Sequence, residues 1–325
     1  MKYLTVCFIL AMTLVNMSCD NLPGNLKPQE SSKMINNPVT EPTPDPVTEP
    51  NPDFVTRWRT NATGKIVSGI DQIKLPLDLD GEYDFTVDWG DGTSDHIASY
   101  NDASVTHTYA VMGEYDVTIT GLCEGFGFKD TGTDNDKFIT VKNWGTVVLH
   151  NKGGQFQQCD NLETFVATDT PCLETITDIH RMFFECDKFN GNINNWDVSN
   201  IEHMYSLFRF AKSYNQPLDK WSFPKIYSIG DMFWCASSFD QPLNDWDVSN
   251  ITIMDHAFGF ASSFDRPLDS WDVSSVTDMS YMSSGASSFN GSIGGWDVAN
   301  EIDMFCMLDG SLLELEGNEP DWYWC

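Results

Sequence analysis

The chain has little positive charge, and its C-terminal part has none. Its 325 residues include 18 Lys and Arg against 48 Asp and Glu, for a formal net charge of −30. No Lys or Arg follows Arg266, whereas eleven Asp or Glu do. A surface of that sign repels phosphate backbones and anionic lipid headgroups, so nucleic acids and direct membrane contact are poor candidates. Cationic partners and divalent cations are favoured instead.

The short motifs that mark common catalytic and cofactor sites are also missing. The sequence has no His-Glu-x-x-His, Gly-x-Ser-x-Gly, phosphate-binding loop, Gly-x-Gly-x-x-Gly or Cys-x-x-Cys. Acidic clusters at residues 78–81 and 130–136 lack the frame of a calcium loop, so solvated turns explain them. We therefore predict no enzyme activity and no cofactor. The six histidines show no metal-ligand spacing: His96, His107, His150, His180, His203 and His256.

One extended apolar run exists, at the amino terminus. Lys2 precedes residues 3–15, a stretch too short to span a bilayer and typical of a secretory signal. Cys19 then follows a small residue, which resembles a bacterial lipoprotein cleavage site where the cysteine is acylated. We expect a lipoprotein signal peptide over residues 1–19 and a lipid anchor on Cys19. Cleavage by the ordinary signal peptidase is the alternative, because Asn16 replaces the usual aliphatic residue.

The next segment, residues 20–53, is rich in proline. It carries eight of the chain's fifteen prolines and repeats Pro-Val-Thr-Glu-Pro. Such a composition predicts an extended, semi-rigid acidic tether. A stalk of this kind suits a displayed receptor better than a buried enzyme, and it places the protein outside the cytoplasm.

Residues 54–128 have a sequence pattern typical of short β-strands. Residues 83–89 alternate between apolar and polar and then turn on Gly-Asp-Gly, while residues 107–109 (His-Thr-Tyr) lead into a second alternating run at 114–119. Alternating strands joined by Gly and Asp turns predict a small antiparallel β-sandwich.

The rest of the chain, residues 129–325, is dominated by a repeat. Trp recurs at an interval of 25, each time within a version of Trp-Asp-Val-Ser-Asn-Ile-Thr-x-Met. A fixed period of this length predicts stacked coils that bury their apolar faces against one another. Trp and Val two residues apart suggest a short strand, and Ile201, Met204 and Phe208 at spacings of three and four suggest a helical turn. The predicted core of the coils comprises Trp196, Trp221, Trp246, Trp271, Trp296, Val198, Val248, Val273, Met204, Met254, Met279, Phe208, Phe233 and Phe258.

Two columns of the repeat admit a functional alternative. An outward Trp ladder would stack on sugar rings, but Trp196 shares its strand face with Val198, so we expect the Trp column in the core. The Asp column, which includes Asp197, Asp247 and Asp272, either accepts local backbone N–H groups or binds Ca²⁺. Ser222 interrupts it, and Ca²⁺ needs six to eight oxygens, so local hydrogen bonding is favoured.

Seven cysteines remain after Cys7 is removed with the signal and Cys19 is acylated. Cys159 and Cys186 occupy equivalent columns in adjacent coils, within disulfide range. Alternatively, they fill the small-residue column that Ala holds in later coils, as buried thiols. A further pair, Cys306 with Cys325, would close the C-terminal cap.

These features together resemble a known family. The Trp-Asp-Val-Ser-Asn core of the repeat and the Phe-Asp-x-Pro-Leu approach to it are similar to BspA-like leucine-rich-repeat surface lipoproteins of bacteria. The Trp-Gly-Asp-Gly and His-Thr-Tyr motifs resemble the PKD-type immunoglobulin-like sandwich, where they are structural. The resemblance implies a PKD-type β-sandwich followed by a right-handed, leucine-rich-repeat-like α/β solenoid of 25-residue coils.

Three functions remain open at this point. The resemblance and the anchor favour a protein of the cell surface or outer membrane that binds a host or environmental protein or glycan through its repeats. A structural component of a cell-surface assembly and a non-catalytic accessory to a secreted hydrolase are the alternatives. An exposed aromatic or apolar patch on the flank of the repeats would favour the first.

Overall fold

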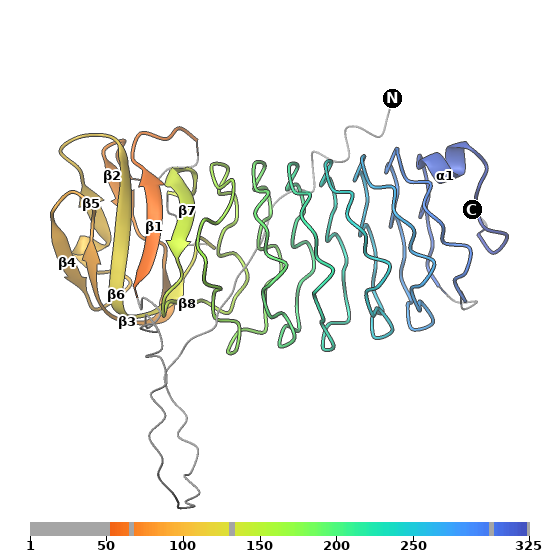
Figure 1. Ribbon diagram of the computed structural model, residues 1–325, viewed down its shortest axis with the longest axis horizontal. Coiled ribbons are helices and arrows are strands. Elements are labelled where there is room, and N and C mark those ends of the chain that lie inside the picture. Colours follow the sequence, from red (N-terminus) through yellow and green to blue (C-terminus); the bar gives the residue numbers. More distant parts are fainter. Residues whose placement is uncertain (1–52, 65–67, 130–133, 299–301, 324–325) are drawn as a thin grey trace, which may run out of the picture.

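The structure is a computed structural model that describes residues 53–64, 68–129, 134–298 and 302–323. A block of β-sheet lies at one end of an elongated molecule, and a row of stacked coils extends from it (Figure 1). The expected signal peptide, Cys19, the tether and Cys325 lie outside the described residues. Within them, no helix is both long enough and apolar enough to cross a membrane.

The N-terminal block is mainly an antiparallel sheet. Its strand order is β4-β3-β6-β1-β7, and a separate pair joins β2 to β5. In β3, Tyr83, Phe85 and Val87 are buried and alternate with exposed residues, so one face of the strand packs into the core. The strands are β1 (Phe54–Arg59), β2 (Gln72–Lys74), β3 (Leu77–Asp88), β4 (Ser94–Ile97), β5 (Thr106–Thr108), β6 (Glu114–Phe126), β7 (Phe138–Asn143) and β8 (Val148–Leu149).

The sheet continues past residue 128, where we expected the sandwich to end. β7 pairs antiparallel with β1, and β8 pairs in parallel with β6. Aromatic contacts also cross this point, since the Phe156 ring lies 6.4 Å from that of Phe128 and 5.6 Å from that of Phe138. Sheet and first coil therefore share one hydrophobic core.

The coils are joined by backbone hydrogen bonds between residues about one repeat apart. The N–H groups of Ser206, Phe208 and Phe210 donate to carbonyl oxygens of the next coil at 2.8–2.9 Å. Other N–H groups of the segment close tight turns within their own coil, as from Arg209 to Ser206. Isolated parallel bridges link Ser228 to Ile253 and continue to Asp278 and Asp303.

The α/β character expected for the coils is wrong. Among the described residues, helix is confined to α1 (Leu312–Leu315) and the short 3₁₀ turns η1 (Ala103–Val105) and η2 (Asn135–Lys137). The spacing of three and four residues between buried side chains results from consecutive tight turns. Their backbones include left-handed residues such as Ser206 (φ 57°), which a right-handed helix excludes. An α-helix would also use internally the N–H groups that here donate to the next coil. The Trp-Val segment is likewise not a strand; it is irregular and lies between two turns.

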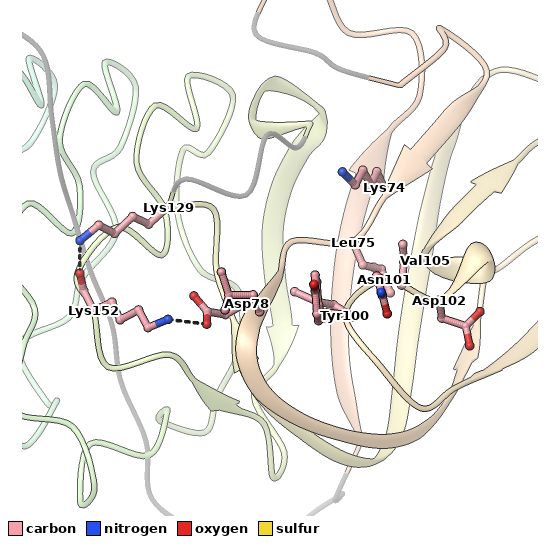
Figure 2. A pocket seen from close by; sticks show the side chains of 11 residues that line it. Lys74, Leu75, Asp78, Tyr100, Asn101, Asp102, Val105, Lys129 and Lys152 are labelled. Carbon is pink, nitrogen blue, oxygen red and sulfur yellow. Dashed lines mark hydrogen bonds and ion pairs between the residues drawn. The ribbon is translucent and has the colours of Figure 1, made fainter.

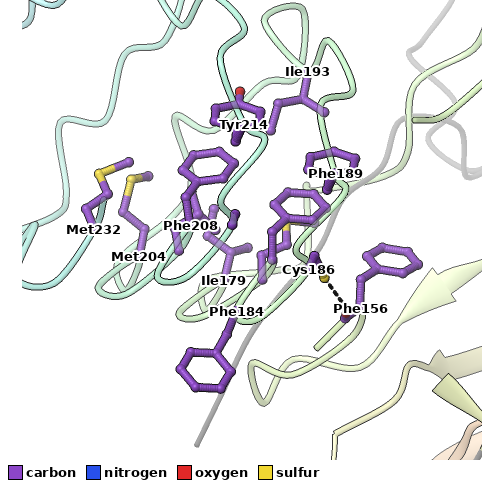
Figure 3. Packing of buried hydrophobic residues seen from close by; sticks show 14 of the residues in the cluster. Phe156, Ile179, Phe184, Cys186, Phe189, Ile193, Met204, Phe208, Tyr214 and Met232 are labelled. Carbon is purple, nitrogen blue, oxygen red and sulfur yellow. Dashed lines mark hydrogen bonds between the residues drawn. The ribbon is translucent and has the colours of Figure 1, made fainter. Parts of the chain in front are cut away.

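Two ladders of aromatic rings fill the coils. Phe183, Phe208, Phe233 and Phe258 stack at 5.5–5.6 Å between centroids, with nearly parallel planes. A second ladder packs against the first, as Figure 3 shows for Phe208 and Tyr214, whose centroids lie 3.9 Å apart. Its members are Phe189, Tyr214, Phe239, Phe264 and Phe289.

The five Trp residues of the repeat are buried along another edge of this core. From Trp221 onward, each indole N–H donates to a carbonyl oxygen 28 residues earlier, as from Trp246 to Leu218 at 3.0 Å. Each Trp thus ties its coil to the preceding one. The Val and Met residues named for the core are buried as well: Val198, Val248, Val273, Met204, Met254 and Met279.

A candidate ligand-binding flank

A hollow of about 660 Å³ lies where the sheet meets the first coil (Figure 2). Its charged side chains bond to one another. Lys152 Nζ donates to Asp78 Oδ1 at 2.7 Å, and Lys129 Nζ donates to the carbonyl oxygen of Lys152. Burial is the largest influence on Asp78 and opposes its ionisation, but the bond from Lys152, the backbone N–H of Asp80 and the nearby positive charges together outweigh burial and lower the pKa of this carboxyl. These charges hold the junction closed, so the hollow is a weak candidate for a binding site.

A stronger candidate lies along one side of the coils. Four columns of the repeat alternate with the buried Met, Phe and Ala columns along this side, and their side chains range from buried, as at Phe184 and Trp234, to exposed, as at Phe305. We call them the variable flank because their residues change chemistry from coil to coil. The first two columns are His180, Tyr205, Gly230, Asp255, Ser280 and Phe305, and Arg181, Ser206, Asp231, His256, Tyr281 and Cys306. The other two are Phe184, Arg209, Trp234, Gly259, Ser284 and Asp309, and Glu185, Phe210, Cys235, Phe260, Gly285 and Gly310.

Two of these columns require a left-handed backbone. φ is 54–57° at Arg181, Ser206, Asp231, His256 and Tyr281. For an L-residue other than Gly this conformation costs about 1–2 kcal/mol. Gly would remove that cost, and it does occupy the last two positions of the other left-handed column. Side chains at the remaining positions therefore carry this cost, which fits a role for those side chains.

Aromatic rings form a continuous row along the flank. The Trp234 ring stacks 6.2 Å from Phe210 and 4.9 Å from His256. His256 in turn stacks 4.8 Å from Tyr281, and Tyr281 meets Phe305 edge to face at 5.4 Å. One ring per coil therefore connects five successive coils. Phe305, the last ring of the row, is 59% exposed.

The N-terminal half of the flank also holds two arginines. Arg209 lies with its guanidinium carbon 3.7 Å from the Trp234 ring centroid and pairs with the carboxylate of Asp231. Arg181 lies 5.5 Å from the Tyr205 ring centroid. Burial raises the pKa of Asp231 despite the attraction of Arg209, and burial lowers the pKa of Arg181. The flank can therefore hold a guanidinium between an aromatic face and a carboxylate, away from water.

The Asp column of the repeat makes local hydrogen bonds. The Oδ1 atoms of Asp197, Asp247 and Asp272 accept the backbone N–H two residues later at 3.0–3.1 Å. Bonds from the Ser side chain and backbone lower the pKa of each carboxyl. The described residues include no group of three or more His, Cys, Asp or Glu arranged to hold a metal ion. The local hydrogen bonding favoured for the Asp column is therefore present at these three residues.

The alternative that Cys159 and Cys186 form a disulfide is wrong. Both residues carry thiols. The Cys186 thiol donates to the carbonyl oxygen of Phe156 at 2.8 Å (Figure 3), and that of Cys159 approaches Gln157 at 3.9 Å. Their column is filled by Ala in later coils, so a small buried group meets the need and no cross-link is required. Cys306 also carries a thiol.

Sequence reasoning missed the variable flank. It followed the constant columns, Trp, Val and Met, which the structure places in the core. The available signal lay in the variable columns next to the constant core positions. In these columns the residue type changes between coils, for example from His to Tyr or from Arg to Trp. Variation alone also describes an unconstrained surface. The row of rings depends on how successive coils stack in register, which the sequence alone does not give.

Comparisons with known proteins address the repeats. The family model described as "Mycoplasma protein of unknown function, DUF285" matches residues 150–263 and 218–313. These overlapping matches together cover half of the chain. No curated protein and no solved structure matches it.

Proposed function

Because the chain belongs to the family described as Mycoplasma protein of unknown function, DUF285, a description that names no activity, we propose a function from its geometry. The protein is a non-catalytic binding protein that recognises an extracellular protein or glycan through the variable flank. In this proposal, a PKD-type sandwich and a right-handed, BspA-like solenoid form the displayed part. A lipid on Cys19 and the tether of residues 20–53 hold it at the cell surface or outer membrane.

The row of rings on the variable flank carries this proposal. The row ends in the exposed ring of Phe305, which leaves apolar surface that a partner can cover. Tyr, Trp and Arg, which the flank concentrates, are the residues most enriched at energetically important contacts. Phe305 on the flank is 59% exposed, and Tyr227, which precedes the flank residue Gly230 by three positions, is 48% exposed. The stacked coils hold these side chains on a rigid frame, so little conformational entropy is lost on binding.

Two experiments test the proposal. In the first, Cys19→Ala should move the chain from the membrane fraction to the soluble fraction; unchanged membrane association would exclude the anchor. In the second, the full chain carrying Tyr227→Ser and Phe305→Ser is compared with the parent on arrays of extracellular proteins and glycans. A loss of tenfold or more is expected, because two exposed rings at the contact are removed.

A matched control replaces two exposed apolar residues of the sheet region, Val111→Ser and Leu122→Ser. This pair changes surface hydrophobicity by a similar amount outside the flank, so it should retain binding. Equal loss in both pairs would show that the flank is not the site. Turnover of a glycan or peptide by the purified chain would overturn the non-catalytic assignment, and self-association lost with the flank rings would favour the structural-assembly alternative.

A further inference from the structure

The variable flank contains an internal example of what it can bind. Arg209 is held face to face with Trp234 and paired with Asp231, and only 7% of its side chain is exposed. A flat guanidinium suits this environment because it stacks on aromatic rings and donates in a planar fork to carboxylates. The flank thus binds a cation of its own at its N-terminal half.

At the C-terminal half, a ring of the flank again lies near a carboxylate, here from the adjoining column that contains Asp278 and Asp303. Phe305 is exposed, and Asp303 lies two residues before it on the same exposed strip. Asp303 Oδ1 accepts the N–H of Phe305 at 3.0 Å, which fixes the carboxylate beside the ring. A parallel bridge brings Asp278 of the preceding coil alongside Asp303. Asp278 and Asp303 are therefore neighbours across two coils, and the exposed Phe305 ring lies two residues beyond Asp303.

The coil of Phe305 has no cation of its own. Arg266 is the chain's last basic residue, so the coil of Phe305 and the cap that follows contain no Lys or Arg. An exposed aromatic ring beside two carboxylates attracts cations through both the ring quadrupole and the charges. We propose that Asp278, Asp303 and Phe305 form a site for an arginine side chain of a partner protein.

The geometry favours a protein over a glycan as the source of the ligand. Sugars stack on open ring faces, but from Phe210 to Tyr281 the rings of the row lie face to face and cover one another. The negative charge of the whole chain also favours a basic protein segment. This inference rests on the proposed function of the variable flank and names its partner more closely.

The test measures binding of short blocked peptides to the full chain by calorimetry. The probes are Gly-Arg-Gly-Arg-Gly and the same peptide with Lys or Gln in place of Arg. The Arg peptide should bind at least tenfold more tightly than the Gln peptide. Asp303→Asn and Phe305→Ala should each weaken Arg-peptide binding about fivefold, because an ion pair or a cation–π contact is lost.

Asp272→Asn is the matched control. Asp272 is also an exposed carboxylate that accepts the N–H two residues later, but it belongs to the Asp column beside Trp271 and not to the column of Asp278 and Asp303 next to the variable flank. Asn keeps that acceptor in both variants and removes one charge. Equal weakening by Asp272→Asn and Asp303→Asn would overturn the site, as would equal binding of Arg and Gln peptides.

The outcomes separate this inference from the proposed function. If array binding depends on Tyr227 and Phe305 while the peptides show no preference for Arg, the flank binds partners but the arginine site is wrong. If the Arg peptide binds as expected while the arrays show no flank-dependent ligand, the site is supported and the broader proposal fails.

Discussion

Trp246 and Trp234 belong to the same coils but have different environments. Trp246 is 5% exposed, and its indole N–H donates to the carbonyl oxygen of Leu218 in the preceding coil. Trp234 is 8% exposed, yet its N–H has no acceptor among the described residues, and its ring face covers Arg209. Burial alone does not distinguish these roles. The partner of the polar atom does, because a buried donor without an acceptor is costly.

This difference separates a column that holds coils together from a flank that offers contacts. Repeats are stabilised by interactions between neighbours, and the Trp column supplies one such interaction at each step from Trp221. The flank contributes less to stability, because several of its residues have a left-handed backbone and several buried polar atoms have no hydrogen-bond partner among the described residues. Natural proteins accept such losses mainly where side chains have another task.

The largest effect should follow from removing a Trp of the constant column. Trp246→Ala eliminates a large buried ring and its hydrogen bond, so the free energy of unfolding should fall by about 3–5 kcal/mol. Chemical denaturation followed by circular dichroism measures this change. A variant as stable as the parent would show that the column does not support the coils.

Much of this comparison could be predicted from the sequence, and part of it could not. The interval of 25 was enough to align Trp246, Val248 and Met254 with their equivalents and to expect them together. It could not distinguish a helix from consecutive tight turns, because both place residues three or four apart on one side. The left-handed positions were also hidden, since Ser206 and Phe210 are not the glycines that usually mark them.

The junction of sheet and coils escaped sequence reasoning for a related reason. The sequence pattern does change near residue 128, from alternating strands to the repeat. However, β7 and β8 return to the sheet by pairing with the earlier strands β1 and β6. Pairing over such distances leaves no local periodic signal. The variable flank depends in the same way on register between coils.

A buried histidine at the junction of sheet and coils is a second polar group whose nitrogen atoms lack hydrogen-bond partners among the described residues, as the indole N–H of Trp234 does. His150 is buried, and neither ring nitrogen has a hydrogen-bond partner among the described residues. Burial lowers its pKa to about 4, against the attraction of Asp78 and together with the repulsion of Lys129 and Lys152. The unfolded chain, with an ordinary pKa near 6.5, binds the proton more readily between these values. The contribution of neutral His150 is therefore complete above about pH 6.5 and is lost as the pH falls to about 4.

The expected loss at His150 is about 3 kcal/mol between pH 6.5 and pH 4. Measuring unfolding across that range for the parent and for His150→Gln isolates the contribution, since Gln does not titrate and should give a flatter profile. His96→Gln, which changes an exposed histidine, should leave the parent's profile in place. An identical slope in His150→Gln would contradict the assignment.

A smaller effect compares the two tryptophans directly. Trp246→Phe keeps most of the ring but leaves the carbonyl oxygen of Leu218 without its donor, so about 1–3 kcal/mol should be lost in addition to the change in packing. Trp234→Phe removes an N–H that has no acceptor among the described residues and should cost less. Both substitutions delete the same atoms, so the difference in unfolding free energy reports the hydrogen bond. Equal losses would mean that the bond contributes nothing.

The smallest effect concerns the end of the array, where a polar residue enters a core column. Ser311 is fully buried in the column that Ala211, Ala236, Ala261 and Ala286 occupy in earlier coils. Its hydroxyl oxygen accepts the N–H of Glu314 and so begins α1. Ser311→Ala restores the residue of the repeat but removes this cap, and capping residues contribute about 1 kcal/mol. We expect the free energy of unfolding to fall by that amount, and Ser311→Thr, which can still cap the helix, to lose less than the Ala variant. If Ser311→Ala instead stabilised the protein, the apolar column would outweigh the cap, and the last coil would follow the same rule as the coils before it.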